Sequence, residues 1–179
     1  MPDPEQATQR LFFALCPNAG LQAGLHALGQ SMRESMGGRV MVARNIHLTL
    51  AFLGSVPLAR IDELRGIGNA IEAGPFELHL TETGCWKRSA VGWIAPATIP
   101  QALASLVEQL RQRLSDAGFR VDDKPFAAHV TLLRKVKCRP EPVAEAASFE
   151  WRVASFALMR SQTLQTGPVY SRVADWPLR

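Results

Sequence analysis

Two short segments of the chain carry the same pair of chemically active side chains. His47-Leu48-Thr49-Leu50 and His129-Val130-Thr131-Leu132 each place a histidine and a threonine two residues apart, between aliphatic residues. Side chains alternate between the two faces of a strand, so each segment is expected to present one imidazole beside one hydroxyl, with its aliphatic residues in a core. Two such strands facing each other across a central cleft supply a general acid, a general base and two hydroxyl donors. The hydrolysis of a phosphodiester needs this set of groups.

The two histidines predict acid–base catalysis at this site. Imidazole has a pKa near neutrality, so one ring can take a proton from the attacking water while the other protonates the departing oxygen. The hydroxyls of Thr49 and Thr131 are expected to donate hydrogen bonds to the charged phosphoryl oxygens. Arg134 lies five residues after His129 and can hold the same phosphate. The basic residues that come after it are Lys135, Lys137 and Arg139.

A third segment, His79-Leu80-Thr81-Glu82, has the same histidine–threonine spacing and serves as an internal comparison. In the expected strand over 76–81, the apolar side chains share one face, and His79 lies with Glu77 on the other. A solvated strand face explains this pattern. His79 is therefore not expected in the site, and His26, within a predicted helix, is expected to have a structural role.

The two motifs fall at matching places in two similar halves of the chain. The first half is predicted to contain a strand, a helix, a short strand and the first motif strand, over residues 9–15, 21–36, 39–42 and 47–53. The second half has the same order, over residues 91–95, 103–114, 119–121 and 128–133. The strand-to-motif spacing is 36 residues from Leu11 to His47 and 38 from Val91 to His129. This near-equality predicts an internal duplication.

The remaining pattern completes an α+β prediction. Gly54 is expected to end the first motif strand, and Pro57 to begin a helix whose apolar stripe continues to Ile71. After a polar loop over 138–148, strands are predicted over 149–160 and 169–174, paired antiparallel through a turn at 166–168. We expect one bilobal domain over residues 1–179, related by a pseudo-twofold axis. Each lobe is an antiparallel sheet with helices on its outer face, and the active site lies in the central cleft.

Composition narrows the class of protein. The chain has 179 residues, 47% of them hydrophobic, which is enough for one full core. No apolar run approaches the ~20 residues of a membrane span, and the polar N-terminus lacks an export signal, so a cytoplasmic protein without membrane contact is expected. The chain is also expected to be a monomer. The net charge is +4, and 16 of the 20 basic residues are arginine, which suits phosphate contacts but also fits a preference for arginine codons.

The cysteines are expected to be chemically inert. Cys16, Cys85 and Cys138 are odd in number and lack C-x-x-C spacing. This pattern argues against both a disulfide framework and a zinc site.

The motifs and their flanks resemble a known family. The chain is similar to the 2H phosphoesterase superfamily, and within it to the RNA 2′,3′-cyclic phosphodiesterases historically called 2′-5′ RNA ligases. The resemblance lies in the opening strand 10–15, the two blocks 45–54 and 128–134, and an ending that includes Tyr170 and the residues 176–178. It covers nearly the whole chain.

The resemblance implies a two-lobed fold and metal-independent hydrolysis, without a cofactor, of the 2′,3′-cyclic phosphate at the end of an RNA or oligonucleotide. His47 would be the proton donor and His129 the proton acceptor. Thr49 and Thr131 would bind the phosphate, and the implied product is a 2′-phosphate. The sequence does not distinguish tRNA fragments, short oligonucleotides and cyclic nucleotides as natural substrates.

Three other functions compete with this one. An ATP-dependent RNA ligase needs a lysine in a K-x-D-G context, which the chain lacks, so only ATP-independent 2′-5′ ligation remains as a rival. A non-catalytic RNA-binding module would show aromatic residues on an open sheet. Phe12, Phe13 and Phe52 are instead expected to be buried, although Trp86 can stack on a base. A metal-dependent hydrolase would need ligand clusters, whereas the motif partners here are threonines.

Overall fold

The computed structural model describes residues 7–138, 147–165 and 167–179. In chain order the elements are β1 (Thr8–Leu15), α1 (Ala19–Met36), β2 (Arg39–Val40), the 3-10 turn η2 (Ala43–Asn45), β3 (Leu48–Pro57), the 3-10 turn η3 (Leu58–Arg60), α2 (Ile61–Asn69), β4 (Phe76–Trp86), β5 (Val91–Pro96), α3 (Gln101–Asp116), β6 (Val130–Arg134), β7 (Phe149–Val153), β8 (Ser155–Leu164) and β9 (Gly167–Pro177). The α+β prediction is confirmed.

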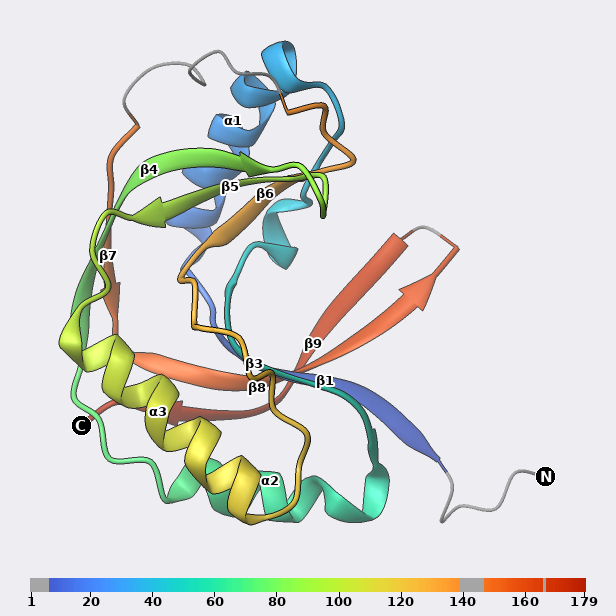
Figure 1. Ribbon diagram of the computed structural model, residues 1–179, viewed down its shortest axis with the longest axis vertical. Coiled ribbons are helices and arrows are strands. Elements are labelled where there is room, and N and C mark those ends of the chain that lie inside the picture. Colours follow the sequence, from blue (N-terminus) through green and yellow to red (C-terminus); the bar gives the residue numbers. More distant parts are fainter. Residues whose placement is uncertain (1–6, 139–146, 166) are drawn as a thin grey trace.

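All described strands belong to one antiparallel sheet made of two halves. The strand order is β7-β4-β5-β6-β3-β1-β8-β9, and β2 pairs separately with β6. The two motif strands, β3 and β6, are neighbours at the centre, where a single residue pair, Leu48 and Val130, joins the halves. The expected meeting of the motif strands is therefore confirmed, although the two lobes share one continuous sheet (Figure 1).

Each half of the sheet is covered by a helix from the other half of the repeat. Helix α1 comes after β1 but packs on β5 and β6, whereas α3 comes after β5 and packs on β3. The stripe of buried residues on α3 that the sequence predicts is Leu103, Leu106, Leu110 and Leu114. This crossover holds the aliphatic residues of both motif strands against helices, because Leu48, Leu50, Val130 and Leu132 are at most 2% exposed. The opposite face of the motif strands is left for their polar residues.

Several element boundaries differ from the predictions. Gly54 does not end the first motif strand, because its φ of 70° lets the backbone continue pairing with β1 as far as Pro57. Residues 119–121 form no strand, and the predicted strand 149–160 is divided at residue 154 into β7, which pairs with β4, and β8, which pairs with β1. The antiparallel pairing of β8 with β9 is confirmed. Of their predicted turn, residue 166 lies outside the described residues.

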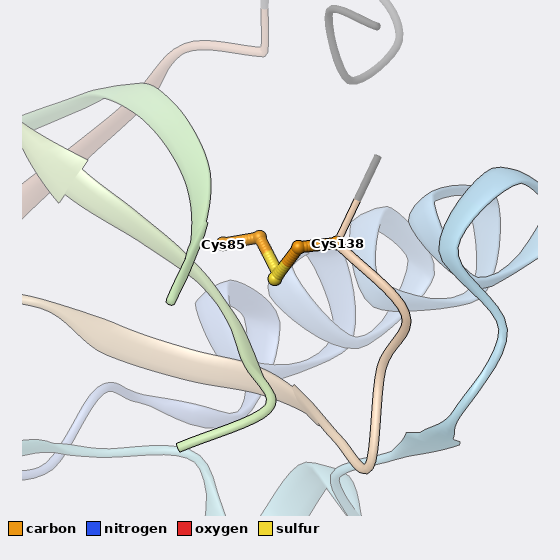
Figure 2. Close-up of a disulfide and its surroundings, with 2 residues drawn as sticks. All are labelled: Cys85 and Cys138. Atoms are coloured by element: carbon orange, nitrogen blue, oxygen red, sulfur yellow. A yellow bond between two sulfur atoms is a disulfide. The ribbon is translucent and has the colours of Figure 1, made fainter. Parts of the chain in front are cut away.

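The expectation that all cysteines are inert is wrong. Cys85, near the end of β4, forms a disulfide with Cys138 after β6, and their Cα atoms are 5.7 Å apart (Figure 2). The two residues are 53 positions apart, so no short motif could reveal them. The folded chain nevertheless brings them within bonding distance. Cys16 is a free, partly buried thiol.

Candidate active site

The join between the two sheet halves brings the four motif side chains together. Leu48 lies directly across from Val130 in an antiparallel pair, and both side chains point into the core. The same register places His47 across from Thr131 and Thr49 across from His129. Because neighbours along a strand point to opposite faces, all four polar side chains lie on the face away from the core. Each is partly exposed.

Each motif strand has a shift of register after its threonine. This shift reverses which face of the sheet the following side chains point to. On β6, Trp93 pairs with Thr131 but Gly92 pairs with Leu133, so Leu132 is an extra residue of the β-bulge type. Leu132 and Leu133 are both buried. The alternation therefore changes phase, and Arg134 returns to the face of Thr131, where it is exposed.

The first motif strand has the same irregularity. Phe13 pairs with Ala51 and Ala14 with Thr49, which leaves Leu50 as the extra residue. Phe52 consequently lies on the polar face and is 46% exposed. The expectation that Phe52 is buried is wrong, whereas Phe12 and Phe13 are buried as predicted.

Backbone contacts set the orientation of the His47 ring. Its Nδ1 lies 2.7 Å from the carbonyl oxygen of Asn45, and a carbonyl only accepts, so Nδ1–H is the donor. In the neutral ring Nε2 then has the lone pair and accepts from the Thr49 hydroxyl at 3.1 Å. Phe12 and Tyr170 pack against the ring, with centroids at 4.8 Å and 5.2 Å. Because Nδ1–H is held by the backbone carbonyl, Nε2 is the nitrogen that can exchange a proton with a substrate.

His129 is held in the equivalent way. Its Nδ1–H donates to the carbonyl oxygen of Ala127 at 2.8 Å, also two residues upstream. Trp86 packs edge-on against the ring, with centroids 4.4 Å apart, and Trp93 packs against Trp86. The disulfide joins Cys85, the neighbour of Trp86, to the segment after β6 (Figure 2). It therefore fixes the strand end that carries this aromatic wall.

Both imidazoles favour the neutral form in the free protein. Burial lowers the pKa of His47 to about 4, against the raising effect of its bond to Asn45, while Arg134 and His129 add positive charge nearby. Burial also lowers the pKa of His129, and Arg134 contributes in the same direction. Arg134 therefore lies within electrostatic range of both histidines. An anion bound between these groups would oppose all of these positive charges.

Several residues of this environment were missed by the sequence reasoning. Asn45 and Ala127 orient the rings through backbone carbonyls, which any residue type could supply, so only their matching position two residues before each histidine was a signal. Asn45 is also 3% exposed, and its amide donates to the carbonyl of Pro168 at 2.8 Å. It thereby ties the first motif to the β8–β9 hairpin that carries Tyr170.

The other two histidines of the chain, His79 and His26, lie outside this arrangement. His79 is exposed on β4, across from Glu150, with Leu78 and Leu80 buried beneath it, as predicted. His26 has its Nδ1 2.8 Å from the carbonyl oxygen of Met41, and this bond supports its expected structural role.

The described part of the chain shows neither a metal-ligand cluster nor a membrane span. Within residues 7–138, 147–165 and 167–179, no three His, Cys, Asp or Glu side chains gather as a metal site would require. No helix in these same residues is long and apolar enough to cross a membrane.

Comparisons with known proteins agree with this geometry. The model of the LigT like Phosphoesterase family matches the chain twice, at residues 15–93 and 94–170, which supports the predicted duplication. The chain is 30% identical to an RNA 2′,3′-cyclic phosphodiesterase of Escherichia coli over 95% of this chain and 97% of that protein. The enzyme of the same name from Thermus thermophilus is also 30% identical, over 95% and 90% of the two chains.

A solved structure shows the same architecture. The crystal structure of E. coli LigT complexed with 3′-AMP superposes with a TM-score of 0.89 at 29% identity, covering 96% of this chain and 99% of that one. The family model matches most of the chain, and each match contains one of the two histidine motifs. The chain therefore belongs to the LigT-like phosphoesterase family, within the 2H phosphoesterases.

Proposed function

We propose that this protein is an RNA 2′,3′-cyclic phosphodiesterase that opens the cyclic phosphate to a 2′-phosphate. The observation that carries the proposal is the mirrored pair of motifs, in which each histidine has its Nδ1–H occupied by a backbone carbonyl. Each Nε2 is then left for proton transfer. Relatives that carry this activity in their names are similar to the chain over nearly its full length.

In the proposed reaction, Nε2 of His129 takes a proton from water as the water oxygen attacks phosphorus. The bond between phosphorus and O3′ breaks, and Nε2–H of His47 gives its proton to the departing O3′. The product has a 2′-phosphate and a free 3′-hydroxyl, so one water is consumed. His129 is then protonated and His47 is neutral, and both return to their starting states when His129 loses a proton to solvent and His47 gains one from it.

Three side chains are proposed to hold the phosphate. The Thr49 hydroxyl, which donates to His47 in the free protein, turns to a phosphoryl oxygen when substrate binds. Thr131 donates from the other motif. Arg134, on the same face, supplies charge-assisted hydrogen bonds to the non-bridging oxygens. These donors stabilise the charge that develops on the phosphoryl group during attack.

The bound phosphodiester also explains how His47 can act as the proton donor although its pKa is low in the free protein. At neutral pH a histidine with a pKa of about 4 is almost entirely deprotonated, whereas the acid must carry a proton. A bound phosphodiester places negative charge beside His47 and raises its pKa. His47 is therefore protonated in the enzyme–substrate complex, where it must donate its proton.

The test is hydrolysis of an oligonucleotide ending in a 2′,3′-cyclic phosphate, with EDTA present. We expect a product heavier by one water, and a ³¹P spectrum that identifies a 2′-phosphate. A 3′-phosphate product would reverse the assignment of the leaving oxygen. Activity lost in EDTA and restored by a divalent ion would replace the two-histidine mechanism by a metal-dependent one.

We also propose a monomer acting in the cytoplasm, and light scattering of the purified chain tests the oligomeric state.

A further inference from the structure

A small pocket lined by arginines adjoins the proposed reaction site. Its walls come from the β2 segment, the turn η2, the end of β6 and the tip of the β8–β9 hairpin, which projects from the sheet in Figure 1. Arg39, Arg44 and Arg134 line it together with Asn45 and Pro168, and its volume is about 120 Å³. Arg134 and Asn45 belong to both this pocket and the surroundings of His47. The two sites are therefore contiguous.

Backbone pairing brings two of the arginines together. Arg39 lies directly across from Arg134 in the β2–β6 ladder, so both side chains project from the same face. Gly38 permits this approach, because a Cβ there would lie 2.6 Å from the carbonyl oxygen of Arg134. Its φ of 83° also favours glycine. The short strand β2 thus places a second guanidinium beside the one that faces the histidines.

These positive charges are not neutralised within the described chain. Its ion pairs join Arg60 with Glu63, Arg65 with Asp62 and Arg172 with Asp175, and none involves an arginine of the pocket. Like charges placed directly across a ladder destabilise a sheet. Three arginines around one small space therefore favour binding of an anion.

The size and construction of the pocket restrict what the anion can be. Its volume of about 120 Å³ is below the ~300 Å³ at which ligand pockets begin. Its small size and its three arginines suit a phosphate group. One wall is fixed, because the buried Asn45 amide donates to Pro168. The same residue orients His47, so the pocket has a set position relative to the reacting centre.

We propose that this pocket binds the phosphate on the 5′ side of the terminal nucleotide, so that the enzyme selects cyclic ends that carry this phosphate, as RNA ends do, over cyclic nucleotides that lack it. The inference rests on the proposed function, because it places the cyclic phosphate between His47 and His129. Arg39 and Arg44 recognise the second phosphate, and Arg134 bridges the two subsites. The substrate class is a 2′,3′-cyclic phosphate that also carries a 5′-phosphate group, whether linked to further nucleotides or not.

The experiment compares three substrates and four variants. Adenosine 2′,3′-cyclic phosphate lacks the second phosphate, its 5′-phosphorylated form adds only that group, and the dinucleotide ApA with a cyclic end adds a nucleoside as well. We expect wild-type kcat/KM to be at least about tenfold higher for both phosphate-bearing substrates. Arg39→Ala and Arg44→Ala should each lower that advantage by about tenfold and leave the simplest substrate within twofold. Arg39→Lys should be intermediate, and the exposed Arg33→Ala, which removes a positive charge elsewhere, should match wild type.

A binding measurement tests the phosphate pocket independently of the proposed catalytic function. Calorimetry with adenosine 2′,5′-bisphosphate and adenosine 2′-monophosphate requires no turnover, and the bisphosphate should bind more tightly only while Arg39 and Arg44 are present. If no cyclic phosphate is hydrolysed but this difference persists, the function fails and the pocket stands. Equal kcat/KM for the three substrates, an advantage that appears only with the dinucleotide, or equal losses on all three in the arginine variants would each overturn the phosphate pocket.

Discussion

Phe52 and Arg134 occupy equivalent positions in the two motif strands. Each lies five residues after its histidine, directly after a pair of buried residues, and each is exposed on the polar face. The two repeats therefore have equivalent backbone positions here, and one position carries an aromatic ring whereas the other carries a cation. Arg10 stacks on Phe52, its guanidinium carbon 4.8 Å from the ring centroid. The positive charge beside both histidines comes from Arg134.

Arg134→Ala should lower kcat/KM by about 10²–10³, because it removes a charged donor aimed at the phosphoryl oxygens. Arg134→Lys should recover part of the loss, since lysine keeps the charge but not the planar fork. Steady-state kinetics on a cyclic-phosphate oligonucleotide measures both. Lys137→Ala, which removes an exposed cation three residues away, is the matched control and should remain near wild type. A loss as large in this control would mean that general charge, rather than position, matters.

Replacing either motif histidine should nearly abolish turnover. His47→Ala and His129→Ala each remove one proton transfer and should each cost roughly 10²–10⁴ in kcat. His79→Ala should behave as wild type, because the same spacing there lies on a solvated strand face two strands from β6. Circular dichroism and thermal melting verify that all three variants fold. A comparable loss in His79→Ala, with the fold intact, would show that the wrong strands have been paired.

The two threonines can be tested by exchanges that separate the hydroxyl from the side-chain shape. Thr49→Val and Thr131→Val keep the branched shape but remove a donor to the phosphate, so each should lower kcat/KM by about 10²–10³. Thr49→Ser and Thr131→Ser keep the hydroxyl and should retain most of the activity. If the valine and serine variants were equally active, the phosphate would not be held by these hydroxyls.

The pH dependence should differ between the free enzyme and its complex. The kcat/KM profile reports the free protein, in which the pKa of His47 is about 4 and that of His129 is also lowered. One ring must be neutral and the other protonated, so this profile should be a bell with its maximum below pH 6.5. Bound phosphate stabilises the imidazolium, so the alkaline limb of kcat should lie at higher pH.

Histidine NMR titration checks the assignment directly. The His47 ring should titrate near pH 4 alone and at higher pH with a saturating 2′-phosphate product. Coincident kcat and kcat/KM limbs, together with an unchanged His47 titration, would contradict the idea that substrate charges the acid.

Local patterns predicted the arrangement of the motif side chains better than the surroundings of these side chains. Alternation placed His47 with Thr49 and His129 with Thr131, and the repeat spacing predicted that the motif strands meet. The extra residues Leu50 and Leu132 could not be foreseen, because buried leucines fit either phase of a strand. That is why Phe52 was expected in the core. The meeting of Arg39 with Arg134 depends on a two-residue strand, which is too short to show a period.

The crossover of the helices was equally hidden in the sequence. The apolar stripes of α1 and α3 show that each helix buries one face, but not which half of the sheet covers it. The same holds for Cys85 and Cys138, whose partnership depends on how β4 and the end of β6 approach each other in the fold. Neither cysteine lies in a short motif that marks a disulfide, and the odd number of cysteines argued against one.

The disulfide should contribute strongly to stability under oxidising conditions. A bridge between residues 53 positions apart restricts the unfolded chain, and the chain-entropy relation gives about 4 kcal/mol of unfolding free energy. Cys138→Ser should lose an amount of this order in urea unfolding, and dithiothreitol should lower the stability of wild type to the same level. Cys16→Ser leaves the bridge intact, so it should keep the wild-type response to dithiothreitol. Three free thiols in the native, non-reduced protein, with Cys138→Ser as stable as wild type, would show that the bridge does not form in solution.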